Sequence, residues 1–381
     1  MSVRPQTIVI VGSLAHSLVN FRGPLLRRLK DMGHSVHAWA GEPDPHSLSW
    51  LSKNNIPFRP LPVQRGSLRP QQDLSLLATL TRWFRQLKPN SVFLYTIKPV
   101  VFGSLAAKAA RIPKIYSLIT GLGSGLLANQ RVQDRIRRKL VHQLYRKSLD
   151  YNQCVFFQNP DDRNYFQDNK LLSPAVERRD VAGSGVDIEH FSAVPVPVHP
   201  VRFLLLARLL YDKGVAEYVQ AARMLKQQYP EAEFVLLGPT DRNPSAVSPE
   251  TVSRWQAEGV VDCVGLQHDV RPYIKQASVL VLPSYREGTP RSVLEAMAMG
   301  RPIITTDAAG CRETVQHGVN GFIVPVRSAR LLATAMERFL ENPELIESMG
   351  QQSLTRAKHI FNVHDVNDDL IDGMGLLRAC S

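Results

Sequence analysis

Two glutamates, Glu287 and Glu295, are the residues of this chain whose spacing points most directly to chemistry. A short run of branched apolar residues at 278–283, typical of a buried strand, precedes them. Thr289 suits the N-cap of a helix, and the Gly-Arg-Pro sequence at 300–302 signals its end. The pattern therefore predicts a strand, a loop that holds Glu287, and a helix that holds Glu295 nearly two turns from its start.

The start of such a helix favours anions, because its N–H groups and the helix dipole attract phosphate. Glu287, just before that start, could accept hydrogen bonds from the hydroxyls of a group attached to the phosphate, and Glu295 could accept them from a ribose. A nucleotide diphospho-sugar carries all of these parts. The alternative is that Glu287 only caps the helix and that Glu295 lies on a solvated face. The other residues expected to contact the donor here are Gly288, Thr289, Arg291 and Ser292.

A second pair of charged residues, Arg208 and Lys213, follows a predicted strand at 202–207. Two cations at the end of a strand can neutralise a diphosphate, the arginine through two parallel hydrogen bonds and the lysine as a point charge. Alternatively, Lys213 is an exposed cation in the first turn of the next helix, where a cation is electrostatically unfavourable. A bound anion removes that disadvantage, so both pairs of residues predict the same ligand.

Strand and helix patterns alternate along the whole chain, which is typical of α/β proteins with a parallel, doubly wound sheet. In this architecture, ligands bind at the loops that follow the carboxyl ends of the strands. Helical patterns are expected at 21–33, 73–87, 101–112 and 361–377. Strands are expected at 7–12, 35–40, 91–96, 114–120, 153–158, 202–207, 233–238, 260–265, 278–283 and 302–307.

With 381 residues the chain is long for a single hydrophobic core, and it is expected to form two domains. The proline-rich sequence at 193–200 is the natural connector. We expect one domain over 1–195 and a second over 196–360, followed by a helical segment at 361–381. Four scattered cysteines without a Cys-x-x-Cys pair indicate neither a zinc site nor a disulfide framework.

Positive charge is concentrated in the first half of the chain. Residues 1–197 hold 27 Lys and Arg against 13 Asp and Glu, a net of +14, whereas residues 198–381 hold 19 against 21, a net of −2. A basic half favours an anionic partner, either nucleic acid or an anionic membrane surface. The chain has no Cys/His finger and no RNP-like sequence, so a nucleic-acid partner is not expected.

The residues from Arg131 to Lys147 hold seven Lys and Arg, with apolar residues at every fourth position. Two interpretations stay open: an amphipathic helix that packs on its sheet, or a surface helix that lies against anionic headgroups. The N-terminus has no signal-peptide pattern, and no uncharged apolar run approaches the ~18 residues of a membrane span. We therefore expect a protein that is soluble or bound to a surface, and its scattered cysteines fit a reducing cytoplasm. The apolar stripe consists of Val132, Ile136, Leu140 and Leu144.

The E-x7-E sequence at 287–295, together with the segments that follow it to Pro325, resembles the signature of retaining GT-B glycosyltransferases of the family 4 type. The resemblance covers most of residues 200–350 closely and the first half loosely. It implies two Rossmann-like domains that face a cleft, with the C-terminal helix crossing back to the first domain. The activity implied is transfer of a sugar with retention of its anomeric configuration.

The same resemblance implies how the donor is bound. The donor would be a UDP-sugar, whose sugar contacts the first glutamate, whose ribose contacts the second, and whose pyrophosphate contacts the R-x4-K pair. No Asp-x-Asp sequence occurs in the chain, so we expect neither a metal ion nor any other cofactor. The catalytic residues implied are Glu287, Arg208 and Lys213.

Loops of the first half also follow predicted strands, and Gly12 and Ser13 at the first of them are expected to lie at the donor. The sequences at 96–99 (TIKP) and 119–124 (ITGLGS) resemble the members of the family that extend lipid-linked oligosaccharides for bacterial surface polysaccharides. Several other members place a histidine after the strand at 114–120, where this chain has a Thr-Gly pair. The residues expected to bind the acceptor are Asn20, Arg22, Lys98, Thr120 and Gly121.

Transfer of a hexose or N-acetylhexosamine to a polyprenyl-diphosphate-linked saccharide is the specific function that this resemblance implies. It also implies a cytoplasmic protein that is bound peripherally to the inner face of the cell membrane. The product would be a capsule, an O antigen or an exopolysaccharide. Two other functions stay open from the sequence: a nucleotide-sugar 2-epimerase of GT-B fold, and a non-catalytic glycan- or lipid-binding protein.

Overall fold

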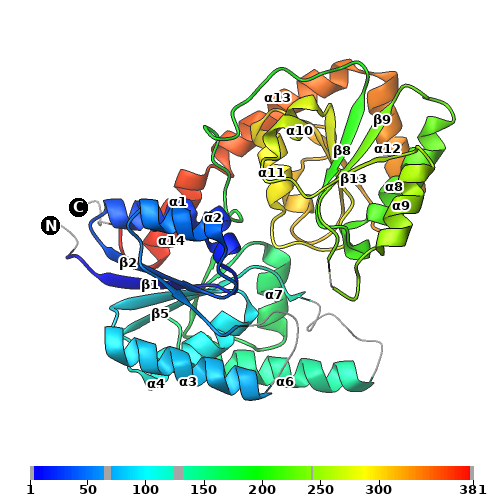
Figure 1. The fold of residues 1–381 in the computed structure, drawn as a ribbon. Helices are drawn as coiled ribbons and strands as arrows, with labels where there is room; N and C mark the ends of the chain where they lie inside the picture. The colour runs from blue at the N-terminus through cyan, green and yellow to red at the C-terminus, as the bar shows by residue number, and fades with distance from the viewer. Residues whose placement is uncertain (1–3, 64–69, 124–131, 242, 378–381) are drawn as a thin grey trace. The chain divides into compact units, whose positions relative to one another are not determined.

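The computed structural model describes residues 4–63, 70–123, 132–241 and 243–377 of the chain. The residues divide into two compact units (Figure 1). Residues up to Ser184, joined by those from Val366 onward, form the first unit, and Gly185–Asp365 form the second. The divisions therefore lie after Ser184 and after Asp365, and not after residues 195 and 360 as the sequence predicts.

Within the described residues, the first unit is built on a seven-stranded parallel sheet in the order β3-β2-β1-β4-β5-β6-β7. Helices α1, α2 and α14 lie on one face and α3, α4 and α6 on the other (Figure 1). The strands are β1 Thr7–Val11, β2 Ser35–Ala40, β3 Phe58–Pro60, β4 Ser91–Tyr95, β5 Lys114–Ile119, β6 Cys154–Phe157 and β7 Glu177–Asp180. The helices are α1 Ala15–Asp31, α2 Pro45–Lys53, α3 Pro70–Leu87, a π-helical turn Pro99–Gly103, α4 Ser104–Ala109, α6 Val132–Leu149, α7 Pro160–Asp168 and α14 Val363–Gly373.

The second unit, over its described residues, has a six-stranded parallel sheet in the order β10-β9-β8-β11-β12-β13. Its strands are β8 Arg202–Leu206, β9 Glu233–Leu237, β10 Asp262–Gly265, β11 Val279–Leu282, β12 Ile303–Thr306 and β13 Gly321–Val324. Its helices are α8 Val215–Lys226, α9 Pro249–Ala257, α10 Arg271–Gln276, α11 Arg291–Ala298, α12 Ala329–Glu341 and α13 Glu344–His359, with short 3-10 turns at Tyr211–Lys213 and Arg312–Thr314.

Both sheets are doubly wound, which confirms the predicted fold class. Their central strands are continuous apolar runs because helices cover both faces, and β4 and β11 are buried at every position. In each unit the strand order reverses once, between β1 and β4 in the first and between β8 and β11 in the second. These two switch points are where open α/β sheets bind their ligands.

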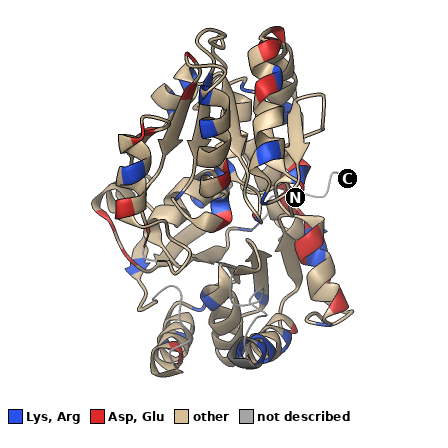
Figure 2. Ribbon diagram, turned by 90° about the vertical axis from the view of Figure 1, so that its right-hand side faces the viewer, with Lys and Arg blue, Asp and Glu red and all other residues tan. Residues whose placement is uncertain are grey.

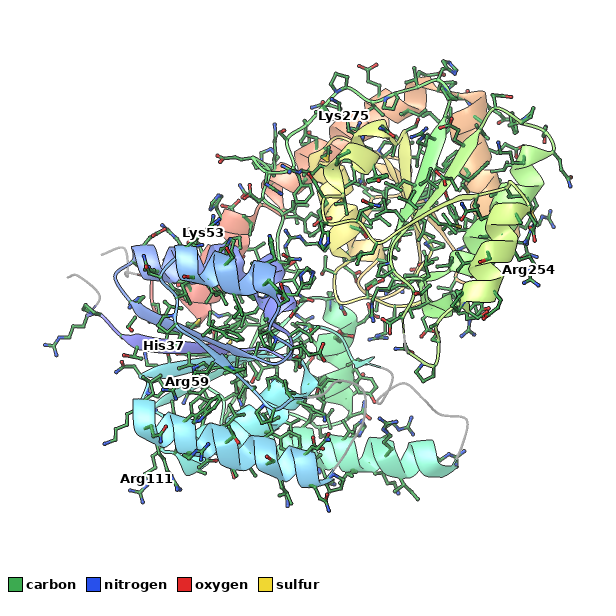
Figure 3. The ribbon with its side chains drawn as sticks, viewed as in Figure 1. His37, Lys53, Arg59, Arg111, Arg254 and Lys275 are labelled. Atoms are coloured by element: carbon green, nitrogen blue, oxygen red, sulfur yellow. The ribbon has the colours of Figure 1, made fainter. Side chains whose placement is uncertain are left out.

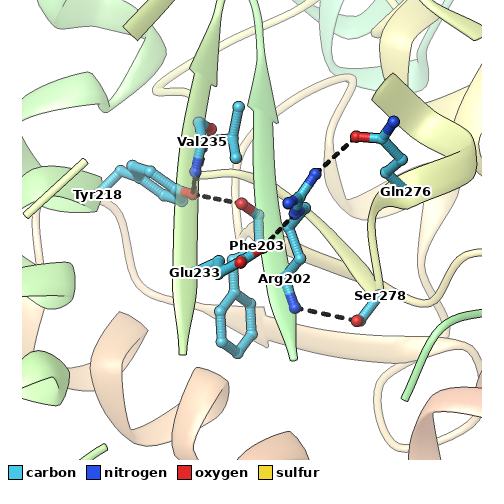
Figure 4. Close-up of polar contacts among 7 residues, drawn as sticks. All are labelled: Arg202, Phe203, Tyr218, Glu233, Val235, Gln276 and Ser278. Atoms are coloured by element: carbon cyan, nitrogen blue, oxygen red, sulfur yellow. Dashed lines mark hydrogen bonds and ion pairs between the residues drawn. The ribbon is translucent and has the colours of Figure 1, made fainter. Parts of the chain in front are cut away.

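Packing of α8 on its sheet is fixed by one buried tyrosine (Figure 4). The Tyr218 hydroxyl donates to the carbonyl of Phe203 in β8 at 2.8 Å and accepts from the N–H of Val235 in β9 at 3.1 Å. At the amino end of β8, Arg202 pairs with Glu233 and donates to Gln276 at 2.6 Å. These contacts fix the position of α8 relative to β8 and β9. The carboxyl ends of the two strands lead into the connections that carry Arg208 and Asp241.

The proline-rich connector belongs to the second unit because a buried arginine binds it there. Arg301 is fully buried, and its five N–H donors reach five backbone carbonyls. Two of those carbonyls belong to Val194 and Pro195 in the connector. Val186 also pairs with Asn362 in a parallel bridge. The chain therefore enters the second unit about ten residues earlier than its composition suggests.

The C-terminal segment packs on the first unit. Arg28 on α1 forms an ion pair with Asp368 at 3.1 Å, and Arg179 on β7 forms one with Asp372 at 2.5 Å. The hydroxyl of Tyr116 on β5 donates to the carbonyl of Met374 at 2.7 Å. Among the described residues, no helix combines the length and the apolarity that crossing a bilayer requires.

Helices α1 and α11, which lead away from predicted site residues, begin at positions other than those the sequence predicts. Helix α1 begins at Ala15 and not at residue 21, so the predicted loop after the first strand is largely helical. Pro24 lies inside this helix, where proline is uncommon, which explains why the sequence suggests a later start. Helix α11 begins at Arg291 with Pro290 as its N-cap, so Thr289 lies one position too early to cap it.

Candidate active site

The residues predicted to bind the donor gather at the switch point of the second unit. The connection after β8 carries Arg208 and Lys213, and the connection after β11 carries Glu287. Because β8 and β11 are parallel neighbours, both connections leave the same edge of the sheet. The topology of the sheet thus brings together Lys213 and Glu287, which are more than 70 positions apart in the sequence.

Lys213 and Glu287 form an ion pair across this switch point, in which Nζ donates to Oε1. Their side chains are only 18% and 13% exposed, so water screens the pair weakly. An unpaired charge at this depth would be costly, and each side chain therefore fixes the position of the other.

Backbone contacts hold the loop that presents Glu287. The N–H of Glu287 donates to the carbonyl of Ala309, and the N–H of Tyr285 donates to the carbonyl of Asp212, both at 2.9 Å. Gly310 has a φ of 79°, and a Cβ on it would lie 2.3 Å from the carbonyl oxygen of Glu287. Only glycine fits there, so the loop is clamped between the turns that follow β8 and β12.

Helix α11 supplies the next part of the site. Its N-cap, Pro290, makes no side-chain capping hydrogen bond, and Ser292 lies in its first turn. Arg291 Nε donates to Glu295 Oε1 at 3.0 Å, one turn along the helix. Burial raises the pKa of Glu295, and the charge of Arg291 opposes that effect. Gly288 and Thr289 form the turn that leads from Glu287 into the helix.

Arg208, the remaining donor residue of this unit, is paired with a residue that the sequence does not single out. Its Nη1 donates to Asp241 Oδ2 at 2.6 Å. Asp241 follows β9, the neighbour of β8 on the side away from β11. Arg208 and Lys213 therefore each carry a carboxylate partner of their own.

Gly12 and Ser13 lie at the corresponding switch point of the first unit. The hydroxyl of Ser13, after β1, lies 2.5 Å from that of Thr96, after β4. A Cβ on Gly12 would lie 2.3 Å from the hydroxyl oxygen of Tyr95, so the tyrosine fills the space beside this glycine. The two units thus present polar residues at equivalent points of their sheets.

The predicted acceptor residues of the first unit are not all equally accessible. Arg22 is 1% exposed, inside α1, with its guanidinium 5.7 Å from the centre of the Tyr95 ring. Asn20 is exposed on the same helix and bonds His16 at 2.9 Å. The Nζ of Lys98 lies 2.8 Å from Asp73, and both side chains are largely buried. The last two residues, Thr120 and Gly121, are half-buried after β5, and Gly121 has a φ of 127°.

The basic helix predicted at 131–147 is α6, but its apolar stripe meets the core at Leu144 and turns away from it at Ile136 and Leu140. Val141 and Tyr145 are buried against the sheet, whereas Ile136 is 64% exposed and Leu140 is 50% exposed. Every fourth residue of an α-helix lies about 40° further around the axis, so a stripe at that spacing turns away from the sheet. Arg131 and the side chain of Val132 lie outside the described residues.

Exposed apolar and basic side chains therefore share the first part of α6. Arg135, Arg137 and Lys139 are exposed beside Ile136 and Leu140. Basic residues also line the other helices of this unit (Figure 2), and the side chain of Arg111, after α4, points away from the sheet (Figure 3). The described part of α6 thus combines exposed basic residues with two exposed apolar side chains.

Sequence reasoning missed the partners of two predicted residues, Arg208 and Lys98, and one further contact beside the Glu287 loop. Asp241 and Asp73 pair with Arg208 and Lys98, and the Tyr285 hydroxyl donates to Glu217 at 2.6 Å. Each of these contacts joins residues at least 25 positions apart, so no local pattern could indicate them.

Both halves of the chain match models of glycosyltransferase domains. Residues 22–179 match the model described as "Glycosyl transferase 4-like domain", and residues 200–342 match the one described as "Glycosyl transferases group 1". The chain is therefore a glycosyltransferase with one domain of each kind, and each match falls within one unit of the structure.

Two relatives match over nearly their whole length. The chain is 28% identical to the N,N'-diacetylbacillosaminyl-diphospho-undecaprenol alpha-1,3-N-acetylgalactosaminyltransferase of Campylobacter jejuni, over 91% of this chain and 93% of that protein. It is 25% identical to the putative glycosyltransferase EpsD of Bacillus subtilis, over 95% of this chain and 94% of that protein.

Among solved structures, Anabaena HepE in complex with UDP and glucose matches with a TM-score of 0.79 and 17% identity, covering 98% of this chain and 100% of that one. The fold is thus that of GT-B enzymes.

Proposed function

We propose that this glycosyltransferase moves a hexose or N-acetylhexosamine from a UDP-sugar to a polyprenyl-diphosphate-linked saccharide, with retention of anomeric configuration, during bacterial surface polysaccharide biosynthesis. The observation that carries the proposal is the contact between Lys213 and Glu287. The sugar and the diphosphate are covalently joined in the donor. A carboxylate that binds the sugar and a cation that binds the diphosphate must therefore be adjacent. The acceptor named for the C. jejuni relative and the UDP bound to HepE support the choice of substrates.

The proposed mechanism assigns each residue a role. Arg208, Lys213 and the N–H groups at the start of α11 stabilise the negative charge that grows on the departing UDP. Glu287 accepts hydrogen bonds from the sugar hydroxyls, and Glu295 accepts one from the ribose. The bond between the anomeric carbon and the diphosphate breaks, and the acceptor oxygen bonds that carbon on the same side. Because the acceptor approaches from this side, the proton of its hydroxyl lies beside the departing phosphate oxygen, and that oxygen receives the proton.

The acceptor is proposed to bind the first unit. Asn20, Lys98, Thr120 and Gly121 are its proposed contacts, with Gly12 and Ser13 close to the donor sugar. Arg22 is buried beneath the surface of α1 and is proposed to act through Tyr95 rather than by touching the acceptor. Lys98 would have to exchange Asp73 for the phosphate of the lipid.

A screen of nucleotide sugars tests the proposed activity. The purified protein is incubated with each radiolabelled donor and with a lipid extract that contains polyprenyl-diphosphate saccharides. We expect label from a UDP-sugar to move to the lipid fraction. Isomerised free donor without labelled lipid would instead identify a 2-epimerase, and an unchanged donor would indicate a non-catalytic binding protein.

Metal independence is part of the proposal, because two cations and a helix start do the work that a divalent ion performs in other transferases. We expect transfer to continue at an unchanged rate after the protein and substrates are treated with EDTA. Activity that disappears in EDTA and returns with Mn²⁺ would contradict this.

The exposed apolar residues of α6 are proposed to insert into the inner face of an anionic membrane, where the surrounding arginines and lysines meet the headgroups. Replacing both Ile136 and Leu140 by serine should weaken binding to phosphatidylglycerol vesicles about tenfold or more, because two apolar side chains no longer insert into the bilayer. Co-sedimentation measures the effect. Leu48→Ser, which changes a 40% exposed leucine on α2, is the control and should bind like the wild type. Equal binding by the double variant would contradict the proposed membrane contact.

A further inference from the structure

The guanidinium of Arg208 is occupied by a carboxylate of the protein itself. The side chains of Arg208 and Asp241 are 41% and 24% exposed, so the pair lies at the surface of the site. Arg208 follows β8 and Asp241 follows β9, whose last residues, Leu206 and Leu237, are paired in register. The ion pair therefore spans the carboxyl edge of the sheet, beside the switch point.

A short strap, defined as residues 243–247, presents Asp241 to Arg208. The N–H of Asn243 donates to Asp241 Oδ1 at 2.9 Å, which leaves Oδ2 for the guanidinium. The N–H of Tyr211 donates to the carbonyl of Ser245 at 2.8 Å, and the N–H of Val247 donates to that of Leu209. The strap thus runs along the segment that joins Arg208 to Lys213, and it positions the carboxylate in front of the first of these cations.

We propose that Asp241 is a built-in counter-ion of the donor site, which neutralises Arg208 in the empty protein and is displaced by the diphosphate of the donor. This rests on the proposed function, in which Arg208 binds that diphosphate. Asp241 accepts from Nη1 of Arg208, and a phosphate oxygen that takes the same N–H group displaces the carboxylate. Donor binding through Nη1 is therefore expected to separate the pair.

The two carboxylates of the site differ in how easily they can leave their cations. Glu287 is 13% exposed and its loop is clamped by backbone contacts, so it stays beside Lys213 when a ligand binds. Asp241 is 24% exposed next to an arginine that is itself 41% exposed, so its carboxylate can be hydrated when it is released. Of the two cations, Arg208 is thus the one that exchanges its partner.

This exchange lowers the affinity for the donor and equally for the UDP product. When UDP leaves, Asp241 returns to Arg208 and competes with rebinding. A protein that must release UDP after each transfer benefits from such a competitor, because an arginine and a lysine without partners would hold the diphosphate product tightly.

Calorimetric titration of the full chain with UDP tests the proposal through four proteins: the wild type, Asp241→Asn, Arg208→Ala and the double variant. Asp241→Asn should bind UDP about two- to fivefold more tightly, the range expected for removal of one partly exposed ion pair. Arg208→Ala should bind more weakly, and adding Asp241→Asn to it should produce no further change. Thermal melting checks that each variant is folded.

The matched control is Glu258→Gln, which breaks the ion pair of Arg223 at the other end of α8, where the side chains are 40% and 33% exposed. Its UDP affinity should equal that of the wild type. Unchanged or weaker binding by Asp241→Asn would overturn the proposal, because Asp241 would then orient Arg208 and not compete for it. Tightening that persists without Arg208 would also overturn it. If Arg208→Ala alone leaves UDP binding unchanged, the diphosphate site of the proposed function is misplaced.

Discussion

Replacing Glu287 by alanine is expected to lower the rate of sugar transfer about a thousandfold or more, the size of effect seen when a preorganised group at a reacting centre is removed. Glu287 is proposed to touch the donor sugar, not the nucleotide. The loss should therefore appear in kcat, and UDP binding should change far less. Steady-state kinetics on the lipid-linked acceptor and calorimetry with UDP measure the two effects separately.

Two further variants separate chemistry from folding in this experiment. Glu287→Gln keeps the shape of the side chain and an oxygen for Lys213, so it should melt near the wild-type temperature and still be inactive. Glu347→Ala removes an exposed glutamate from α13 and should leave both activity and stability unchanged. Full activity in a folded Glu287→Ala protein would contradict the assignment of Glu287 to the site.

Replacing Arg301 by methionine is expected to destabilise the second unit by about 3–5 kcal/mol, because five buried carbonyls lose their donors at once. Burial lowers the pKa of this guanidinium to about 10, so it remains charged at neutral pH. The carbonyls of Ala277, Met299 and Lys275 receive three of its N–H groups, and the connector receives the other two. Hydrogen exchange of β11 and β12, which reports the second unit alone, measures the loss.

Two further variants test whether the planar arrangement of five donors, and not only the positive charge, stabilises the second unit. Arg301→Lys should recover little, since an ammonium has three donors where the site needs five in a plane. Arg202→Met removes a half-exposed arginine of the same unit (Figure 4) and should cost about 1 kcal/mol or less. Protease cleavage near Val194 should also become faster in Arg301→Met. Exchange rates equal to those of the wild type would show that the carbonyls find other donors.

The central strands of both sheets could be predicted from the sequence, because burial on both faces demands continuous apolar runs. The strands that sequence reasoning missed, β3, β7 and β13, lie at sheet edges in the described structure. Strand β7 reads Glu-Arg-Arg-Asp and β3 ends in proline. Edge strands need apolar residues less, and an edge position tolerates proline, so neither strand has the expected pattern.

The candidate site shows the same division between local and non-local information. Lys213 and Glu287 could be singled out because each follows a strand pattern, and the parallel sheet brings both strand ends to one edge. Asp241 and Asp73 carry no local signal, since their importance depends on cations that approach from other connections. The four-residue spacing in α6 was misleading for a geometric reason, because the face that packs on the sheet turns with the helix.

A crystal structure of the protein with UDP is the most direct test of the central claim. We expect the pyrophosphate within hydrogen-bonding distance of Arg208, Lys213 and the first N–H groups of α11, with Glu295 against the ribose and Asp241 released from Arg208. A pyrophosphate bound elsewhere on the chain, with both cations still paired to their carboxylates, would contradict the account.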